Sequence, residues 1–537
     1  MATMFKSPNV IVTEASVSQY VTNEPISTGV QVIRAKRGQV VPRFISSTRQ
    51  FKEMYTLTQR GVDSSYVEQY SAVAFLEVGY SGLWVVRAVG SGAEYAYVIV
   101  NKSDAADAVS VPTAGLAVAS DRSGPVFPAW SSLGNDAVML IYCKSPGAVG
   151  NNISVAIPTV NTTNNTFELE VTEKLPDGSI QVRYSGNVSL NPDAKDGYGN
   201  SLFVSSVLDK NEYVGAVVNP SAYGLLPHVV ANAVNLAGGI DTDPSNSDII
   251  SAYNQFGNRE VWDVDIFIQG GIGDTSVQTS LINIAESRGD SIAILDVPLN
   301  IYTVEDIKAW RSTSGSGLSV SSSYGIAVAP WLKTYDFDND FQVYIPPSGV
   351  VAGMLAKVDK EFDPWWVPAG LNRGKVNVLG LKAYYGLSDR DELDSVQVNC
   401  FIRKPGVIAL WNNRTLQTFE NYFSFIEVRR LTNYIKKNVC RFLDSFLFEP
   451  LTDFTRERLV ATLREFMDSI QRRMGIMKYA VVSDQLGTGN NPPDMVDNGI
   501  LTVELYYLPV RAIRGIWLKA TVTRFGYQLA ESVGSQV

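Results

Sequence analysis

The clearest alternation of apolar and polar positions in the chain lies in residues 499–525, and it predicts two β-strands. The apolar positions are Leu501, Val503 and Leu505 in the first strand and Ile516, Leu518, Ala520 and Val522 in the second. A period of two places each apolar set on one face, which is typical of a half-buried antiparallel hairpin. Pro509 and Gly515 mark the connection between the two strands. Because an isolated hairpin is marginally stable in water, this one is expected to need further strands.

A second short strand is predicted near the start of the sequence, within Asn9–Thr13. Its apolar residues are Val10, Ile11 and Val12. The residues up to about 20 hold too little apolar surface to form a core, so they are expected to be an arm. We therefore hypothesise that the strands at both ends of the sequence add to the sheets of neighbouring copies, which would join many copies into one assembly.

Between these strands the pattern changes several times, which indicates a multidomain α+β protein. We divide the sequence into an N-terminal arm (1–20), a first α/β part (21–92), an inserted β-rich outer domain (93–230), a second α/β part (231–345), a C-terminal domain (346–525) and a tail (526–537). The inserted domain is rich in Val, Thr, Ser, Asn and Gly. Its clearest feature is a hairpin in which Pro176-Asp177-Gly178 separates two alternating runs. The C-terminal domain is expected to be a helix-plus-hairpin unit that strands from neighbouring copies complete.

Strands and helices alternate in the two α/β parts, which favours a layered sheet with crossover connections. Strands are predicted at 29–33, 84–87, 264–268, 291–296 and 324–329. Helices are predicted at 51–55, 66–77, 247–256, 277–288, 304–312 and 351–358.

Two amphipathic helices are predicted in the C-terminal domain, one after Phe425 and one from about Thr455. Residues 425–478 hold 11 Lys and Arg against 7 Asp and Glu, in a chain whose net charge is −9. A solvated helix face is the simplest interpretation of this local excess. A basic surface that faces an acidic protein partner is the more specific hypothesis. Binding to nucleic acid is a third hypothesis, which no motif supports.

Composition limits the classes of function. The chain of 537 residues is 45% hydrophobic and 18% charged, so it can bury several cores. Its negative net charge disfavours binding to nucleic acid. The start of the sequence lacks the apolar run of a secretory signal, and no apolar run approaches membrane-spanning length. Three widely spaced cysteines argue against a disulfide framework and suit a reducing compartment.

A search for catalytic and metal-binding motifs predicts no catalytic, cofactor or metal site. His228 is the only histidine, so a serine triad or a histidine-based zinc site lacks its other members. The run Asp336–Asp340 resembles the start of a calcium loop, but Phe341 and Pro347 occupy the positions of the required Gly and Glu. We favour a solvated acidic turn over weak calcium binding. The glycines of Gly370–Lys375 do not have the spacing of a phosphate loop and are expected to turn the chain.

Trp365 and Trp366 beside Asp363 suggest a sugar platform as an alternative. A glycosidase requires two carboxylates at a defined separation, which a sequence alone does not show. Buried aromatic anchors are the preferred interpretation of these tryptophans.

An ordered set of short motifs resembles the tail sheath proteins of contractile bacteriophages and related injection systems. The resemblance extends from residue 10 to about 525. Its best-matching stretch is Pro346–Gly353. The other matching stretches are Gly29-Val30, Arg37-Gly38, Pro42, Phe51, Trp84–Arg87, Asp196–Asn200, Leu236–Asp241, Arg288–Asp290, Leu295-Asp296, Ala329–Trp331, Pro368–Gly370, Val398-Asn399, Trp411–Thr415, Val428–Leu431, Phe448–Pro450 and the closing hairpin.

The sequence departs from the family pattern in two places. Met54-Tyr55 stands where Phe-Gly is usual, and Gly79–Gly82 replaces a double glycine. Both departures lie in the outer part, so they affect the expected surface detail and leave the core assignment unchanged.

The resemblance implies a structural protein without enzymatic activity or cofactor. Subunits would form hexameric rings that stack helically around a tail tube, and contraction of the sheath would drive the tube through the host envelope during genome ejection. The partners implied are the protein itself, the tail tube protein, and the baseplate and tail terminator proteins, without nucleic acid and without membrane insertion. The protein would be part of the virion tail and would assemble in the host bacterial cytoplasm.

The resemblance also implies roles for particular residues. The terminal strands, Val10–Val12, Leu501–Leu505 and 516–522, would pair with sheets of neighbouring subunits. The candidates for contact with the tube are Arg456, Arg458, Arg464, Arg472 and Arg473. The alternative from another functional class is a tail-borne or secreted carbohydrate-active enzyme built on the β-rich insert.

Overall fold

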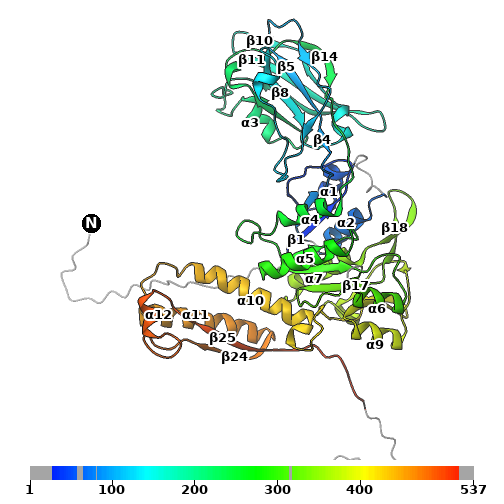
Figure 1. Cartoon of the computed structure of the whole chain (residues 1–537), viewed down its shortest axis with the longest axis vertical. Coiled ribbons are helices and arrows are strands. Elements are labelled where there is room, and N and C mark those ends of the chain that lie inside the picture. The colour runs from blue at the N-terminus through cyan, green and yellow to red at the C-terminus, as the bar shows by residue number, and fades with distance from the viewer. Residues whose placement is uncertain (1–26, 57–64, 80, 314–316, 519–537) are drawn as a thin grey trace, which may run out of the picture.

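The computed structural model describes residues 27–56, 65–79, 81–313 and 317–518. Three parts follow one another along the molecule (Figure 1). A β-rich part lies at the top of this view, an α/β part lies in the middle, and a helical part with a small sheet projects to the lower left. The mixed helix and strand architecture predicted from the sequence is confirmed at this level.

A nine-stranded sheet forms the α/β part, in the order β2-β3-β1-β15-β16-β17-β22-β23-β20. The six strands from β3 to β22 are parallel, and β2, β23 and β20 join antiparallel at the two edges. The strands are β1 (Gly29–Ile33), β2 (Arg43–Ile45), β3 (Leu83–Arg87), β15 (Ile266–Ile268), β16 (Ile292–Asp296), β17 (Gly325–Ala329), β20 (Lys375–Val376), β22 (Val398–Lys404) and β23 (Val407–Leu410).

Helices cover both faces of this sheet, as buried parallel strands require. Helices α1 (Thr48–Tyr55), α2 (Val67–Gly79) and α7 (Pro347–Glu361) contribute to the core on one face. Helices α4 (Asn246–Asn254), α5 (Thr275–Arg288), α6 (Val304–Ser312) and α9 (Leu387–Ser395) contribute to the core on the other face. Along β16, Ile292 and Ile294 enter the first core, while Ala293 and Leu295 enter the second. The strands and helices predicted for the α/β parts are all present, with ends shifted by a few residues.

The β-rich part contains antiparallel sheets around a single core. One sheet has the order β10-β11-β9-β14 with β12 paired to β11, a second has the order β13-β8-β5-β6, and β4 pairs with β7. The hairpin predicted around Pro176–Gly178 is the β11–β12 pair. The elements are β4 (Glu94–Tyr95), β5 (Tyr97–Asn101), β6 (Val109–Ser110), β7 (Leu116–Ala117), β8 (Ala137–Cys143), β9 (Ile153–Ile157), β10 (Val160–Asn161), β11 (Thr166–Lys174), β12 (Ile180–Val188), α3 (Val204–Asp209), β13 (Val214–Val218) and β14 (Val230–Asn235).

The helical part holds α10 (Ile426–Asp444), α11 (Asp453–Arg472) and a sheet made of β24 (Ile476–Val482) and β25 (Glu504–Pro509). We call residues 426–518 the C-terminal module. A small sheet is formed by β18 (Leu332–Asp336), β19 (Phe341–Ile345) and β21 (Gly380–Leu381). The remaining elements are the short helices α8 (Gly370–Arg373) and α12 (Pro493–Asp497) and the 3₁₀ turns Trp130–Ser132, Ala148–Asn152, Pro220–Ala222 and Tyr422–Ser424.

In the part of the chain that the structure describes, the pairing predicted for residues 499–525 is not the one observed. Its first half forms β25, but β25 pairs with β24, which precedes it in the sequence. Residues 510–518, which include Ile516 and Leu518, form no strand, and Ala520 and Val522 lie outside the described residues. The prediction overlooked β24 because its exposed positions also carry apolar residues, such as Met477 and Val482, and a register shift after Ile476 interrupts the alternation.

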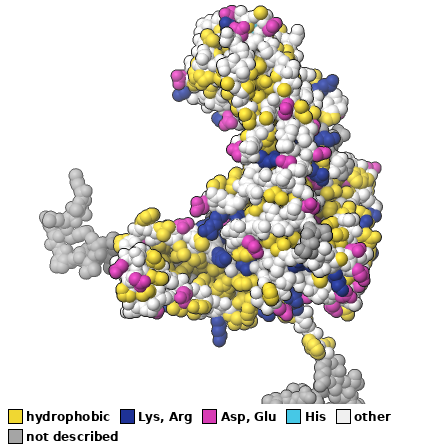
Figure 2. Space-filling view, viewed as in Figure 1, with side chains coloured by type: hydrophobic (Ala, Val, Ile, Leu, Met, Phe, Trp, Pro, Cys, Tyr) yellow, Lys and Arg dark blue, Asp and Glu magenta, His cyan; other side chains and the backbone are white. Residues whose placement is uncertain are grey.

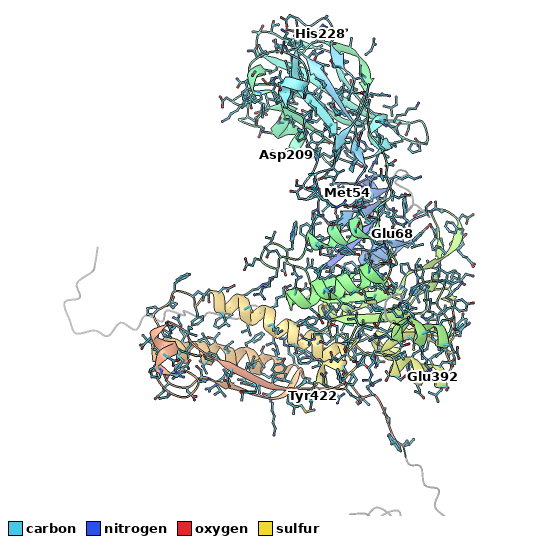
Figure 3. All side chains as sticks on the ribbon, viewed as in Figure 1. Met54, Glu68, Asp209, His228, Glu392 and Tyr422 are labelled. Carbon is cyan, nitrogen blue, oxygen red and sulfur yellow. The ribbon has the colours of Figure 1, made fainter. Side chains whose placement is uncertain are left out.

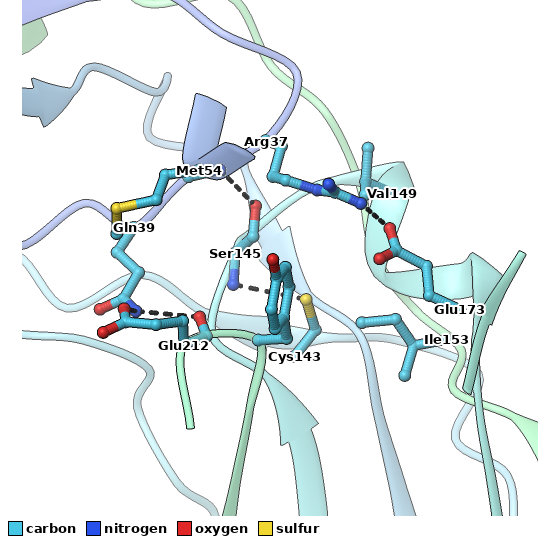
Figure 4. A pocket seen from close by; sticks show the side chains of 11 residues that line it. Arg37, Gln39, Met54, Cys143, Ser145, Val149, Ile153, Glu173 and Glu212 are labelled. Atoms are coloured by element: carbon cyan, nitrogen blue, oxygen red, sulfur yellow. Dashed lines mark hydrogen bonds and ion pairs between the residues drawn. The ribbon is translucent and has the colours of Figure 1, made fainter. Parts of the chain in front are cut away.

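The junction between the β-rich part and the α/β part is built around buried arginines. Arg87 of β3 donates hydrogen bonds to the carbonyls of Ala35 (2.5 Å) and Pro146 (2.5 Å). Arg37 forms an ion pair with Glu173 of β11, beside a cavity of about 20 Å³ (Figure 4). Burial lowers the pKa of Arg37 to about 10. Because breaking a buried ion pair is costly, these contacts hold the two parts firmly together.

The best-matching motif of the sequence has a structural explanation in α7. The Asp296 carboxylate accepts hydrogen bonds from the Ser348 amide (2.7 Å), the Ser348 hydroxyl (2.6 Å) and the Gly271 amide (2.8 Å). These bonds satisfy free amides and hydroxyls where α7 begins. Burial raises the pKa of Asp296 to about 7, while the hydrogen bonds oppose this rise.

Two glycines of the same motif allow α7 to approach α2 closely. A methyl group at Gly349 would lie 2.2 Å from the Ser71 carbonyl oxygen, and one at Gly353 would lie 2.9 Å from Val78 Cβ. Helix backbones come this close only where small residues face one another. The motif therefore specifies the packing of the two helices on one face of the sheet.

We predict that Gly349→Ala lowers the free energy of unfolding by about 1–3 kcal/mol, because the added methyl group overlaps the α2 backbone. Helix propensity alone would make the alanine variant about 1 kcal/mol more stable. The expected change in the free energy of unfolding is therefore opposite in sign to the change at a helix position without close neighbours. Urea denaturation measures the difference. Gly197→Ala is the matched control, since no heavy atom lies within 4 Å of a methyl group there. Equal stability of the two variants would contradict this packing.

Candidate assembly surface

The C-terminal module packs its two helices and its sheet around a core of their own. Helix α10 buries Leu431 and Ile435, and α11 buries Leu463 and Phe466. The Thr452 hydroxyl accepts a hydrogen bond from the Thr455 amide and caps the start of α11. Both amphipathic helices predicted from the sequence are therefore confirmed, and their apolar faces support β24 and β25.

The sheet of the C-terminal module has an inner and an outer face. Val481 pairs with Leu505 and Tyr479 pairs with Tyr507, and these four side chains face the helices. On the outer face Lys478 pairs with Leu508, Ala480 with Tyr506 and Val482 with Glu504. The apolar side chains that remain exposed on this face and beside it are Met477, Val482, Tyr506 and Leu508.

No other strand covers the outer edges of this sheet within the part of the chain that the structure describes. There, β24 and β25 pair only with each other. Two carbonyls of β24 already accept hydrogen bonds from side chains, Met477 from Gln471 (2.8 Å) and Val482 from Asn490 (3.4 Å). Because an uncovered strand edge is a template for strand addition, these edges are the candidate positions for a further strand.

The segment that follows β25 exposes large apolar side chains. Ile516, Trp517 and Leu518 are 84%, 99% and 89% exposed. The segment leaves the body at the lower right of Figure 1, and hydrophobic side chains are visible there in Figure 2 just ahead of the grey atoms. Since each of these side chains gains about 1.5–3 kcal/mol on burial, a partner that covers them would bind favourably.

The predicted strand residues are thus divided between three places. Leu501, Val503 and Leu505 lie against the core of the C-terminal module and belong to its own sheet or the loop before it. Ile516 and Leu518 are exposed and unpaired in the part of the chain that the structure describes. Val10, Ile11, Val12, Ala520 and Val522 lie outside the described residues.

The five predicted contact arginines differ in exposure. Arg456 is buried, forms an ion pair with Asp453 (3.1 Å) and donates to the Ser483 carbonyl (2.8 Å). Arg473 pairs with Asp363 (2.5 Å). Arg456 therefore joins α11 to the chain after β24 and offers little surface to a partner, whereas Arg473 ties the C-terminal module to Asp363 and its side chain stays 36% exposed.

Among the other three arginines, Arg458 is about as exposed as Arg473, and the remaining two lie further toward solvent. Arg458 is half-buried and lies 3.7 Å from Glu449. Arg464 and Arg472 are exposed on α11. These last two are the positions at which charge is available to another protein.

Buried charges attach the C-terminal module to the α/β part through α10. Arg430 forms an ion pair with Asp359 of α7, and Lys437 pairs with Asp265 beside β15. Asn433 donates to the Ser291 carbonyl (3.1 Å). Burial raises the pKa of Asp359 to about 7, while Arg430 lowers it. These three polar contacts hold α10 in one position on the sheet, although Asp359 Oδ1 and Asn433 Oδ1 are buried without a hydrogen bond.

The motifs considered for chemistry have structural roles. Asp336 accepts hydrogen bonds from the amides of Asp338 (2.9 Å) and Asn339 (3.1 Å), which makes it the cap of its own turn. Gly370 adopts φ +81°, and a methyl group at Gly374 would lie 2.8 Å from the Leu410 carbonyl oxygen, so these glycines turn the chain. The His228 ring contacts the Val229 carbonyl in the β-rich part (2.9 Å; Figure 3).

The tryptophan pair does not form a sugar platform. Trp365 is buried and donates to the Arg473 carbonyl (3.1 Å), while Asp363 is engaged by the Arg473 guanidinium. The preferred interpretation of Trp365 as a buried anchor is confirmed. Among residues 27–518 as described, no group of three His, Cys, Asp or Glu side chains is arranged to hold a metal ion. None of the described helices is both long enough and apolar enough to span a membrane.

Curated proteins with similar sequences are tail sheath proteins of bacteriophages. The chain is 27% identical over 363 residues to the tail sheath protein of Enterobacteria phage T4, covering 63% of this chain and 54% of that protein. It is 25% identical over 499 residues to that of Vibrio phage KVP40, covering 86% and 71%. The chain thus matches about half the length of the T4 protein. No protein-family model matches the chain.

Solved structures of sheath proteins share the fold. The sheath tail protein of Listeria innocua aligns with a TM-score of 0.54 at 13% identity, covering 91% of this chain and 96% of that one. The helical sheath of the anti-feeding prophage in its contracted state aligns with a TM-score of 0.52 at 13% identity, covering 97% and 99%. The resemblance to tail sheath proteins of contractile phages and related injection systems is confirmed. The comparisons give no support to a carbohydrate-active enzyme.

We predict that the triple substitution of Ile516, Trp517 and Leu518 by serine leaves the free energy of unfolding of the monomer within about 0.5 kcal/mol of the original, because exposed positions contribute little. Val481→Ser in the core of the C-terminal module is the control, and we expect it to cost more than about 2 kcal/mol. Thermal and urea denaturation give both values. A large loss of stability in the triple variant would show that these side chains pack on their own subunit.

Proposed function

We propose that this protein is the structural subunit of a contractile tail sheath and that it acts by assembly and movement without bond-making chemistry. The observation that carries the proposal is the sheet of β24 and β25, whose outer edges no other strand of the described residues covers, in a chain with the fold of sheath proteins. The exposed apolar residues 516–518 supply a segment suited to such an edge.

In the proposed assembly, six copies form a ring and the rings stack helically around a tail tube. The segment after β25, together with the residues around Val10–Val12, adds to the sheets of neighbouring copies. Each added strand forms a row of backbone hydrogen bonds, each worth about 0.5–1.5 kcal/mol net. A shift by one residue would turn the apolar face of the added strand toward solvent, so the register of the lattice is maintained.

Contraction then follows from the way the C-terminal module is attached. The extended lattice is held by the tube and the baseplate, and its release allows subunits to rotate outward and gain contacts. The ion pairs Arg430–Asp359 and Lys437–Asp265 make the module follow the α/β part as one body. The exchanged strands keep the rings joined while the sheath shortens and drives the tube through the host envelope during genome ejection.

The proposed partners are further copies of this chain, the tail tube protein, and the baseplate and tail terminator proteins. Nucleic acid and membrane are not contacted in this proposal. The C-terminal domain (346–525) lies next to the tube and the inserted domain (93–230) faces outward. Assembly takes place in the bacterial cytoplasm, and the finished sheath is part of the virion tail.

We predict that the purified full-length protein forms long hollow tubes in negative-stain electron microscopy and that a variant without residues 1–14 remains folded but forms none. The described fold begins at residue 27, so the deletion leaves every described element intact. A circular dichroism spectrum equal to that of the full-length protein is the folding control. Regular tubes from the truncated protein would contradict strand exchange by the N-terminal arm.

We predict that Arg464→Glu/Arg472→Glu weakens binding of the subunit to assembled tail tubes by at least about tenfold, because two exposed positive charges are reversed on a surface that faces an acidic partner. Co-sedimentation with tubes at two salt concentrations measures the effect, which should shrink at high salt. Arg49→Glu on the exposed face of α1 serves as the charge control. Unchanged tube binding would remove α11 from the contact.

A further inference from the structure

Residues 511–514 are held on the body by three separate contacts just before the exposed apolar residues begin. Arg514 donates to the Asp394 carboxylate (2.6 Å) at the end of α9. The Arg511 guanidinium lies 4.3 Å from the centre of the Phe425 ring. The Arg511 guanidinium also lies 5.6 Å from the centre of the Tyr422 ring.

The groups that receive these contacts are themselves fixed. Phe425 is 2% exposed, and Arg414 and Arg514 lie 5.0 Å and 5.2 Å from its ring centre. Asp394 is also bound by Arg414 (3.1 Å), so one carboxylate joins two guanidinium groups. Two residues after Phe425, the Glu427 carboxylate accepts a hydrogen bond from Asn413 (2.8 Å). The binding surface is therefore rigid before the segment is placed on it.

Within a few residues, the segment changes from bound to the body to exposed to solvent. Val510 donates to the Gly475 carbonyl (3.1 Å), so the chain is tied to the sheet of the C-terminal module up to this point. After Arg514 comes Gly515, and then Ile516, Trp517 and Leu518 project into solvent. The segment departs close to Tyr422, which Figure 3 labels at the base of the body, and Glu392 of α9 lies nearby on the right.

We propose that Arg511 and Arg514 form a clamp that fixes the direction in which residues 515–518 leave the body and so presents their apolar side chains to a second copy of this chain. This rests on the proposed function, since the receiving strand edge belongs to a neighbouring subunit. A flexible segment would lose conformational freedom on binding, at about 1–2 kcal/mol per residue for the backbone. The clamp removes part of this cost before the partner arrives, which is preorganisation.

The clamp also explains why charged residues interrupt the alternating pattern. Arg511 and Arg514 carry long apolar stems and planar guanidinium groups, which stack on an aromatic ring and bind a carboxylate at the same time. Lysine would satisfy the charge but would lack the flat, forked group. The clamp is therefore a positioning device, and Arg511 and Arg514 need not touch the partner to affect assembly.

The test compares the full-length protein with Arg514→Ala, Asp394→Asn and Arg511→Ala/Arg514→Ala, with Arg49→Ala as the control for loss of one exposed positive charge. The rate of chymotrypsin cleavage after Trp517 reports on the clamp, because Trp517 is exposed and a segment that moves freely is cleaved faster. We expect this cleavage to be about tenfold faster in the three clamp variants. Hydrogen exchange in the buried strand β1 should stay unchanged in all variants, which shows that the fold is intact.

The second measurement is the protein concentration at which tubes appear. The clamp variants should require about tenfold more protein than the original and the Arg49→Ala control. An unchanged rate of cleavage after Trp517, or an unchanged threshold for tube formation, would overturn the clamp. A variant that ends at residue 510 separates the two proposals, because the proposed function requires that it forms no tubes. If this shortened variant forms tubes at the same protein concentration as the original, the proposed strand exchange is wrong.

Discussion

The rest of the structure depends on a sheet that the described residues leave incomplete. Backbone amides and carbonyls must be paired wherever water is excluded, and a two-stranded sheet leaves one row of them open on each side. Natural proteins usually protect such edges with charges, prolines or a covering element. Here the inner face of β24 and β25 rests on a well-packed helical core, while no other strand of the described residues covers either edge. The stability of the sheet comes from α10 and α11, so the sheet stays folded without a further strand.

The position of this sheet matters as much as its open edges. Helix α10 is shared between the core of the C-terminal module and the α/β part, where its buried side includes Arg430 and Asn433. Breaking one buried ion pair of this kind typically costs about 3–5 kcal/mol, so the helix does not swing independently at low cost. Displacement of the body is therefore passed directly to the strand edges. At the other end of the body, Arg87 and Arg37 attach the β-rich part in the same manner.

The sequence predicted the body of the fold well and the assembly surface only in part. Buried parallel strands such as Ile292–Asp296 are continuous apolar runs, and apolar residues in the helices between them recur at helical spacing. Both kinds of element can therefore be predicted without tertiary information. The partner of β25 was missed because exposed positions of β24 also carry apolar residues, Met477 and Val482, and a register shift after Ile476 interrupts the alternation. The burial of Arg456 depends on the Ser483 carbonyl, which is distant in sequence. The clamp was missed because it joins Arg514 to Asp394 across 120 residues of chain.

The motifs that carry the resemblance explain why a sequence identity near 25% identifies the fold. They also explain why the same identity says less about the contacts between subunits. Asp296, Ser348 and Gly349 are required by backbone atoms of α2 and α7 inside one subunit, and such contacts tolerate few alternatives. A strand edge is different, because its hydrogen bonds come from the backbone and demand only that side chains alternate. Arg511 and Arg514 lie between these two cases. They bind specific side chains of their own subunit, but the segment that they direct would bind its partner through backbone hydrogen bonds. Residue-level specificity is therefore expected at the base of the segment, where its direction is set, and tolerance is expected along the strand itself.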